Sequence, residues 1–165
     1  MKLENGDIIN QLGKFEVVLC TTNSHIKQNG NLIMDKGNAY ALNLLTNKEF
    51  SLFAGLYLKK IFPQTWQFPK LMTYGCVIPW SYNGNNSIMY TGKNSLLGLF
   101  QTKYCFYNSS TVELVTRSTC MLTRLAEVYT SIACPFPGIG LGNLLSYQVM
   151  PIIEKLPDNV VFFKL

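Results

Sequence analysis

Two glycine-bearing loops are the parts of this 165-residue sequence best suited to chemistry. One runs from Pro135 to Asn143 and carries three glycines in five positions, and the other runs from Met34 to Ala39 and contains Gly37. Glycine lets the backbone approach another molecule closely because it has no Cβ. Backbone N–H groups at the start of a helix attract anions, phosphate above all. Each loop is therefore a candidate phosphate-binding loop.

Both loops are expected at the same edge of a sheet. A predicted strand at 17–20 leads into the short polar run Thr21–Ser24, and the Met34–Ala39 loop then opens a helix. The second loop follows a predicted strand at 131–134 and precedes a helix that begins near Ser146. Ligands of open α/β sheets bind outside the carboxyl ends of the strands. The two loops together predict a diphosphate held between them.

The remaining pattern predicts an α/β fold. The sequence favours strands at 3–5, 17–20, 96–102, 131–134 and 160–163 and helices at 37–47, 50–61, 110–125 and 146–155. A capping box with Ser110 as N-cap and Glu113 at the third helical position opens one of these helices. Residues 63–69 read as a loop, and residues 72–95 suit a meander or hairpin with its turn at 83–86. Alternating strands and helices imply a mostly parallel sheet covered on both faces.

Composition narrows the class of protein. Apolar residues make up 48% and charged residues 14% of the chain, as expected for one folded domain spanning 1–165. The net charge of +5 favours anionic partners, but the basic residues are too dispersed for direct nucleic-acid binding. With five scattered cysteines and one histidine, we expect neither a metal, a cofactor nor a disulfide framework. We also expect no membrane span and no signal peptide, hence a cytoplasmic protein.

The order of these motifs resembles the macrodomain family, an α/β/α sandwich that binds ADP-ribose. The resemblance rests on Gly6-Asp7-Ile8, on the strand ending in Thr22-Asn23 and on the two glycine loops. The chain is similar to small phage and bacterial macrodomains, and also to the branch that contains terminal ADP-ribose protein glycohydrolase and the DNA ADP-ribosylation antitoxin. The segment 100–103, which ends in Thr102-Lys103, resembles the corresponding strand end of that branch. The resemblance implies a three-layer sandwich around a mixed, mostly parallel sheet.

The resemblance also implies a set of ligand-binding residues. Asp7 would accept a hydrogen bond from the adenine amino group, with Ile8 beside it, and Asn23, next to Thr22, would contact the distal ribose. Gly37, Asn38 and Ala39 would bind one phosphate, and Pro137, Gly138, Ile139, Gly140, Leu141 and Gly142 the other. Local sequence leaves simpler roles open: Asp7 as a turn or cap residue, Asn23 as an Asx turn, and the glycines as ordinary loop residues.

Lys103 is the candidate for catalysis. In the glycohydrolase branch the matching lysine attacks the anomeric carbon, which requires a lowered pKa. The acid that this branch places in the last loop is missing, because Gly142 occupies its position. Asp35 and Lys36 also stand where small residues are usual, and Asp35 would repel a phosphate unless it points outward or pairs with Lys36. His25 is expected to be a surface loop residue rather than a catalytic base.

Three functions follow from these observations. The first is binding of ADP-ribose or a closely related ADP-ribosyl metabolite. The second is hydrolysis by Lys103, either removing ADP-ribose from a protein or DNA or cleaving ADP-ribose 1″-phosphate. The third is a structural domain that has lost its ligand. The expected partner is ADP-ribose or an ADP-ribosylated macromolecule, with nucleic acid only as a modified substrate. The binding function agrees best with the sequence.

Overall fold

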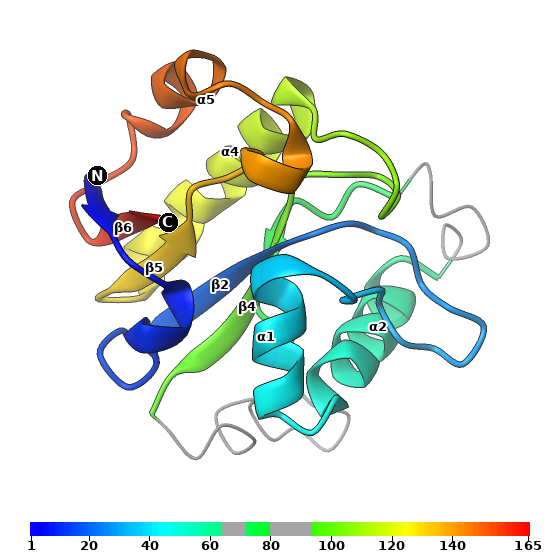
Figure 1. Ribbon diagram of the computed structural model, residues 1–165. Coiled ribbons are helices and arrows are strands. Elements are labelled where there is room, and N and C mark those ends of the chain that lie inside the picture. The colour runs from blue at the N-terminus through cyan, green and yellow to red at the C-terminus, as the bar shows by residue number, and fades with distance from the viewer. Residues whose placement is uncertain (64–71, 80–93) are drawn as a thin grey trace.

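A computed structural model describes residues 1–63, 72–79 and 94–165 (Figure 1). The strands are β1 (Lys2–Asn5), β2 (Val17–Thr22), β3 (Cys76–Val77), β4 (Leu96–Gln101), β5 (Ile132–Pro135) and β6 (Val160–Lys164). The helices are α1 (Gly37–Leu45), α2 (Glu49–Ile61), α4 (Val112–Val128) and α5 (Ser146–Ile153), with short 3-10 turns η1 (Ile8–Gln11) and η3 (Gly140–Gly142). Every strand and helix predicted within these residues is present, with ends shifted by a few positions.

The described strands form one mixed sheet in the order β1-β6-β5-β2-β4-β3. Neighbouring strands run parallel except β3 and β4, which are antiparallel. The predicted turn at 83–86 and residues 64–69 of the predicted loop lie outside the described residues. The parallel strands bring their carboxyl ends to one edge, where their loops meet.

Helices cover both faces of this sheet, as Figure 1 shows. Alternate residues of β2 divide between two buried clusters, with Val18 and Cys20 facing α1 and α2 and Val17 and Leu19 facing α4 and α5. A strand buried on both faces needs an almost continuous apolar run, which explains the composition of residues 17–20. The three-layer α/β/α sandwich with a mostly parallel sheet is therefore confirmed.

The start of α4 differs from its prediction. The N-cap is Thr111, whose hydroxyl accepts a 3.2 Å hydrogen bond from the Leu114 N–H. Glu113 consequently falls at the second helical position, and the predicted capping box with Ser110 is wrong. The reason lies in tertiary structure: the backbone N–H of Ser110 donates to the Gly142 carbonyl at 2.8 Å. That bond holds Ser110 against the last glycine loop and moves the cap one residue onward.

Candidate functional site

The candidate site residues follow four different strands of the sheet. Asp7 comes after β1, Asn23 after β2, Lys103 after β4 and the Pro137–Gly142 loop after β5. Because these strands run parallel in one sheet, all four segments lie at its carboxyl edge. This is the edge at which ligands of α/β sheets bind. The fold thus gathers residues that are up to 135 positions apart in the sequence.

The first glycine loop is tied firmly to the end of β2. Gly37 is the first residue of α1 and has a φ of +62°, a left-handed conformation that favours glycine. The Asn38 carboxamide accepts a 2.9 Å hydrogen bond from the Thr21 N–H and donates one of 3.0 Å to the Thr21 hydroxyl. Ala39, in the first turn of the same helix, is buried. Asn38 therefore positions the start of α1, whose first N–H groups have no partner within the helix.

The three glycines of the second loop serve different purposes. A Cβ at Gly138 would lie 2.6 Å from the Leu144 side chain, and one at Gly142 would overlap the Ser110 hydroxyl. Gly140 is different, because a Cβ there would meet no atom within 4 Å. Gly138 and Gly142 are thus needed for packing within the protein. At Gly140 the position that a Cβ would occupy faces open space, and its φ is +63°.

The two loops lie against each other. A Cβ at Gly37 would sit 3.9 Å from the Leu141 side chain, which is 63% exposed at the surface. The Lys103 ammonium donates a 2.7 Å hydrogen bond to the Leu141 carbonyl, on the second loop. Leu141 thus lies beside Gly37 and is bonded by Lys103, which brings the second loop, Gly37 and Lys103 to the same part of the carboxyl edge.

The pKa of Lys103 is lowered from its ordinary value. Partial burial is the main cause, and the positive charge of Lys36 adds to it. The backbone of Lys103 is held in place, since its N–H donates to the Thr22 carbonyl at 3.3 Å. Its carbonyl accepts a 3.2 Å hydrogen bond from the side chain of Gln101. A held amine with a lowered pKa is a better nucleophile than an ordinary surface lysine.

Asp7 caps the turn that follows β1. One oxygen of its carboxylate accepts a 3.0 Å hydrogen bond from the Ile9 N–H, and the side chain stays partly exposed. Ile8 points the other way, into the core beneath α1 and α2, with an exposed fraction of 3%. Asp7 therefore fills the cap role that local sequence allowed. The cap hydrogen bond involves one of the two oxygens of the Asp7 carboxylate.

Thr22 and Asn23 are buried and already hydrogen-bonded. The Thr22 hydroxyl bonds to the Tyr74 hydroxyl, which donates a 2.8 Å hydrogen bond to the Asn23 carbonyl. The Asn23 carboxamide accepts from the His25 N–H at 2.8 Å and donates to the Ile33 carbonyl at 2.9 Å. Both ends of this carboxamide therefore stabilise the turn after β2, as an Asx turn does.

His25 is half-buried, contrary to its expected place on a surface loop. Its ring packs edge-on against Phe106, with ring centroids 5.3 Å apart. Its Nδ1 atom is buried and has no hydrogen-bond partner among the described residues. The turn fixed by Asn23 carries His25 inward, an effect that sequence could not show.

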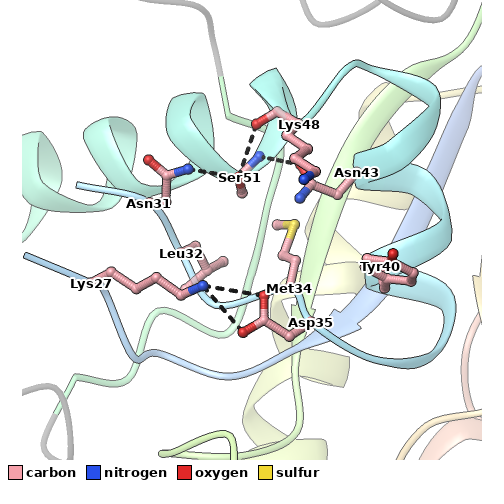
Figure 2. A pocket seen from close by; sticks show the side chains of 9 residues that line it. All are labelled: Lys27, Asn31, Leu32, Met34, Asp35, Tyr40, Asn43, Lys48 and Ser51. Carbon is pink, nitrogen blue, oxygen red and sulfur yellow. Dashed lines mark hydrogen bonds and ion pairs between the residues drawn. The ribbon is translucent and has the colours of Figure 1, made fainter. Parts of the chain in front are cut away.

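A pocket of about 150 Å³ lies beside the first loop, between residues 27–35, α1 and the start of α2 (Figure 2). On one of its walls the Asp35 carboxylate receives hydrogen bonds of 3.2 Å from the Lys27 ammonium to both oxygens. By its sequence position Asp35 would repel a phosphate unless it pointed outward or paired with Lys36. In the structure it is exposed, and its ion-pair partner is Lys27.

Two buried residues that support this site carry no signal in the sequence. Gln101 is fully buried and accepts hydrogen bonds from the backbone N–H groups of Tyr74 and Gly75, at 2.8 and 3.2 Å. Tyr74 in turn bonds Thr22, and burial raises its pKa well above the ordinary value. Partners more than 25 positions apart give no local pattern, so these roles appear only in the folded chain.

The described part of the chain has neither a metal-ligating cluster nor a long apolar helix, and its cysteines are thiols. It contains no group of three or more His, Cys, Asp or Glu residues placed to hold a metal ion. All five cysteines are free thiols, and four of them are buried. Cys20, Cys76 and Cys134 lie in strands, where they serve as small core residues. Each helix in the described residues is too short or too polar to cross a bilayer.

No protein-family model and no curated protein matches the sequence. Solved structures do match. The macrodomains of Thermus aquaticus DarG and Mycobacterium tuberculosis DarG are each 17% identical to this chain, with TM-scores of 0.64 and 0.66. Each match covers 99% of this chain and 97% of the other.

A third match is Thermosipho africanus DarTG in complex with ADP-ribose, at 19% identity and a TM-score of 0.58. It covers all of this chain and 42% of that longer one. At such low identity the likeness concerns the fold, and here it extends over the whole chain. The chain therefore has the fold of a macrodomain, as the order of its motifs predicted.

Proposed function

We propose that the chain binds ADP-ribose, or a closely related ADP-ribosyl metabolite, across the carboxyl edge of its sheet. The observation that carries the proposal is the meeting of the two glycine loops at Leu141, whose carbonyl accepts a hydrogen bond from the Lys103 ammonium. A diphosphate bears two negative charges. These charges are complemented by the N–H groups at a helix start, by an open glycine backbone and by an ammonium group. The net charge of +5 acts in the same direction.

One of the similar structures supports the same ligand. The DarTG protein of Thermosipho africanus, 42% of which is covered by the match, was solved with ADP-ribose. In our proposal the adenine lies beside Asp7 and the backbone of Ile8, and one phosphate lies against Gly37–Ala39. The other phosphate lies against Pro137–Gly142, where Gly140 faces open space. Thr22 and Asn23 shape the distal end of the site.

Calorimetric titration with ADP-ribose, AMP and NAD tests this proposal. ADP-ribose should bind most tightly, because AMP lacks the second phosphate and the distal ribose. NAD should bind more weakly, because nicotinamide occupies the anomeric position beside Lys103. If none of the three ligands produced heat of binding, or if AMP bound as well as ADP-ribose, the proposal would fail.

A second candidate function, hydrolysis of an ADP-ribosyl bond, is favoured by the position of the Lys103 amine at the second glycine loop, together with its lowered pKa. In this reaction the neutral amine attacks the anomeric carbon as the bond to the modified group breaks. The resulting glycosylamine loses a proton and its ring opens to an imine, which a hydride reagent can reduce. Without that reagent, water hydrolyses the imine and releases the ribose from the lysine. Gly142 offers no carboxylate, so the leaving group must take its proton from elsewhere. Such an enzyme would be slow or would depend on an acid supplied by its substrate.

Reductive trapping separates binding from catalysis. ADP-ribosylated protein or DNA is incubated with the chain and a hydride reagent, and the lysine–ribose adduct is located by mass spectrometry. An adduct on Lys103 that is absent from Lys103→Ala and Lys103→Arg supports hydrolysis. Turnover that continues undiminished in Lys103→Ala would exclude Lys103 as the nucleophile. Binding without turnover on either substrate would leave the chain a binding module.

A further inference from the structure

The first glycine loop carries two adjacent residues of opposite charge, and the fold keeps these charges apart. Asp35 and Lys36 directly precede Gly37. Figure 2 shows the Asp35 side chain turned toward Lys27, which bonds both carboxylate oxygens. Asp35 thus faces the pocket beside α1, and Lys36 is left without its sequence neighbour as a counter-ion.

The position of Lys27 is set by a tight turn. Its backbone N–H donates to the Asn31 carbonyl at 2.8 Å, and its carbonyl accepts from the Gly30 N–H at 2.9 Å. Ile26 and Leu32, on either side of this turn, form an isolated antiparallel bridge. An exposed ion pair of this kind adds at most about 1 kcal/mol to stability. The ion pair therefore contributes little to stability, but it fixes the position of the Asp35 carboxylate.

Lys36 is an exposed cation in the first glycine loop. It is the N-cap residue of α1 and directly precedes Gly37. Among the described residues it forms no ion pair. Its neighbour Gly37 lies against Leu141, whose carbonyl holds Lys103. The positive charge of Lys36 reaches Lys103, since it helps to lower the pKa of that lysine.

We propose that Lys36 and Lys103 form a two-lysine clamp for the diphosphate, and that Lys27 holds Asp35 out of it. This inference rests on the function proposed above and adds the residues that set its affinity. Two ammonium groups without a counter-ion repel each other, and a bound diphosphate relieves that repulsion. A free Asp35 carboxylate would oppose the same anion. Lys27 is therefore a positioning residue, which acts through Asp35.

The test measures the affinity of the full chain for ADP-ribose at low and high salt. Lys36→Met removes the charge and keeps the aliphatic stem. It should weaken binding about tenfold at low salt, and by less as salt rises. Lys155→Met is the matched control, because Lys155 precedes the amino end of β6, at the opposite edge of the sheet. It should bind like the wild type.

The role of Lys27 is tested by a pair of variants. Lys27→Met frees the Asp35 carboxylate and should weaken binding about threefold, and adding Asp35→Asn should restore it. Thermal melts of all variants confirm that each is folded. Equal affinities of the wild type and Lys36→Met at every salt concentration would overturn the clamp and leave ADP-ribose binding intact. A wild-type chain that does not bind ADP-ribose would overturn the proposed function and this inference together.

Discussion

The ammonium group of Lys103 donates a 2.7 Å hydrogen bond to the backbone carbonyl of Leu141. These residues follow β4 and β5, which lie on either side of β2 in the sheet. The bond links the candidate nucleophile to the loop proposed to bind a phosphate. A ligand that moves this loop therefore also changes the surroundings of the lysine.

The reactivity of Lys103 should differ from that of other lysines. Because burial and Lys36 lower its pKa, its neutral amine appears at lower pH, and acylating reagents should modify it at lower pH than they modify the lysine of a short unstructured peptide. Lys36→Met should raise the pKa of Lys103, although burial keeps it below the ordinary value. Competitive labelling against such a peptide, followed by mass spectrometry across pH, measures both effects. Identical pH profiles for Lys103 and the peptide lysine would contradict this expectation.

The same shift predicts a pH dependence of stability. The charged form of Lys103 is less stable in the folded state than in the unfolded chain. The unfolded state therefore binds more protons at pH values between the folded and the unfolded pKa of Lys103. The contribution of Lys103 to stability should therefore rise with pH from its folded pKa up to the ordinary lysine value. Urea unfolding across this window, with Lys103→Met as reference, should show a gain in the wild type alone. A gain of equal size in Lys103→Met would assign it to other groups.

Gly140 should be the glycine whose substitution affects the ligand most directly. Gly140→Asn suits the left-handed backbone better than a branched residue does, so it should cost only about 1 kcal/mol of stability. Its side chain would enter the open space of the proposed phosphate site and lower ADP-ribose affinity about tenfold or more. Gly13→Asn is the control, since the exposed Gly13 has a φ of +83° and precedes the amino end of β2, at the opposite edge of the sheet. Unchanged calorimetric affinity in a folded Gly140→Asn variant would remove Gly140 from the site.

Asp7 should combine a structural and a ligand-binding role, which two variants can separate. Asp7→Ala removes the cap on the Ile9 N–H and should cost about 1 kcal/mol of stability, whereas Asp7→Ser can keep that hydrogen bond. Both variants lose the carboxylate proposed to accept from adenine and should lose about 1.5–3 kcal/mol of affinity. Thermal melts and calorimetry measure the two effects. Full affinity in Asp7→Ser would show that Asp7 is a cap residue only.

The corrected N-cap of α4 gives a prediction about stability alone. Thr111→Ala removes the bond to the Leu114 N–H and should cost about 1 kcal/mol. Ser110→Ala should change stability by less than about 0.5 kcal/mol, because the buried Ser110 hydroxyl has no partner among the described residues. Urea unfolding of the two variants provides the comparison. The opposite order of effects would restore Ser110 as the cap.

The strands and helices were predictable because their signals are local. The apolar run at 17–20 and the repeated strand–helix alternation follow from burial on two faces of a sheet. The two glycine loops could also be placed at one edge, because the carboxyl ends of parallel strands lie together. The cap of α4 could not be assigned, since both Ser110 and Thr111 carry a suitable hydroxyl.

The sequence by itself determined the layer order, the edge of the sheet at which the candidate site residues lie and the residue types gathered there. Only the tertiary structure decided what each residue does there. It separated Gly140, which faces open space, from Gly138 and Gly142, which are needed for packing. It paired Asp35 with Lys27, eight positions away, and not with its neighbour Lys36. The physical reason is that hydrogen bonds, ion pairs and steric contacts depend on distances in space, which the chain sets only once its distant segments have packed together.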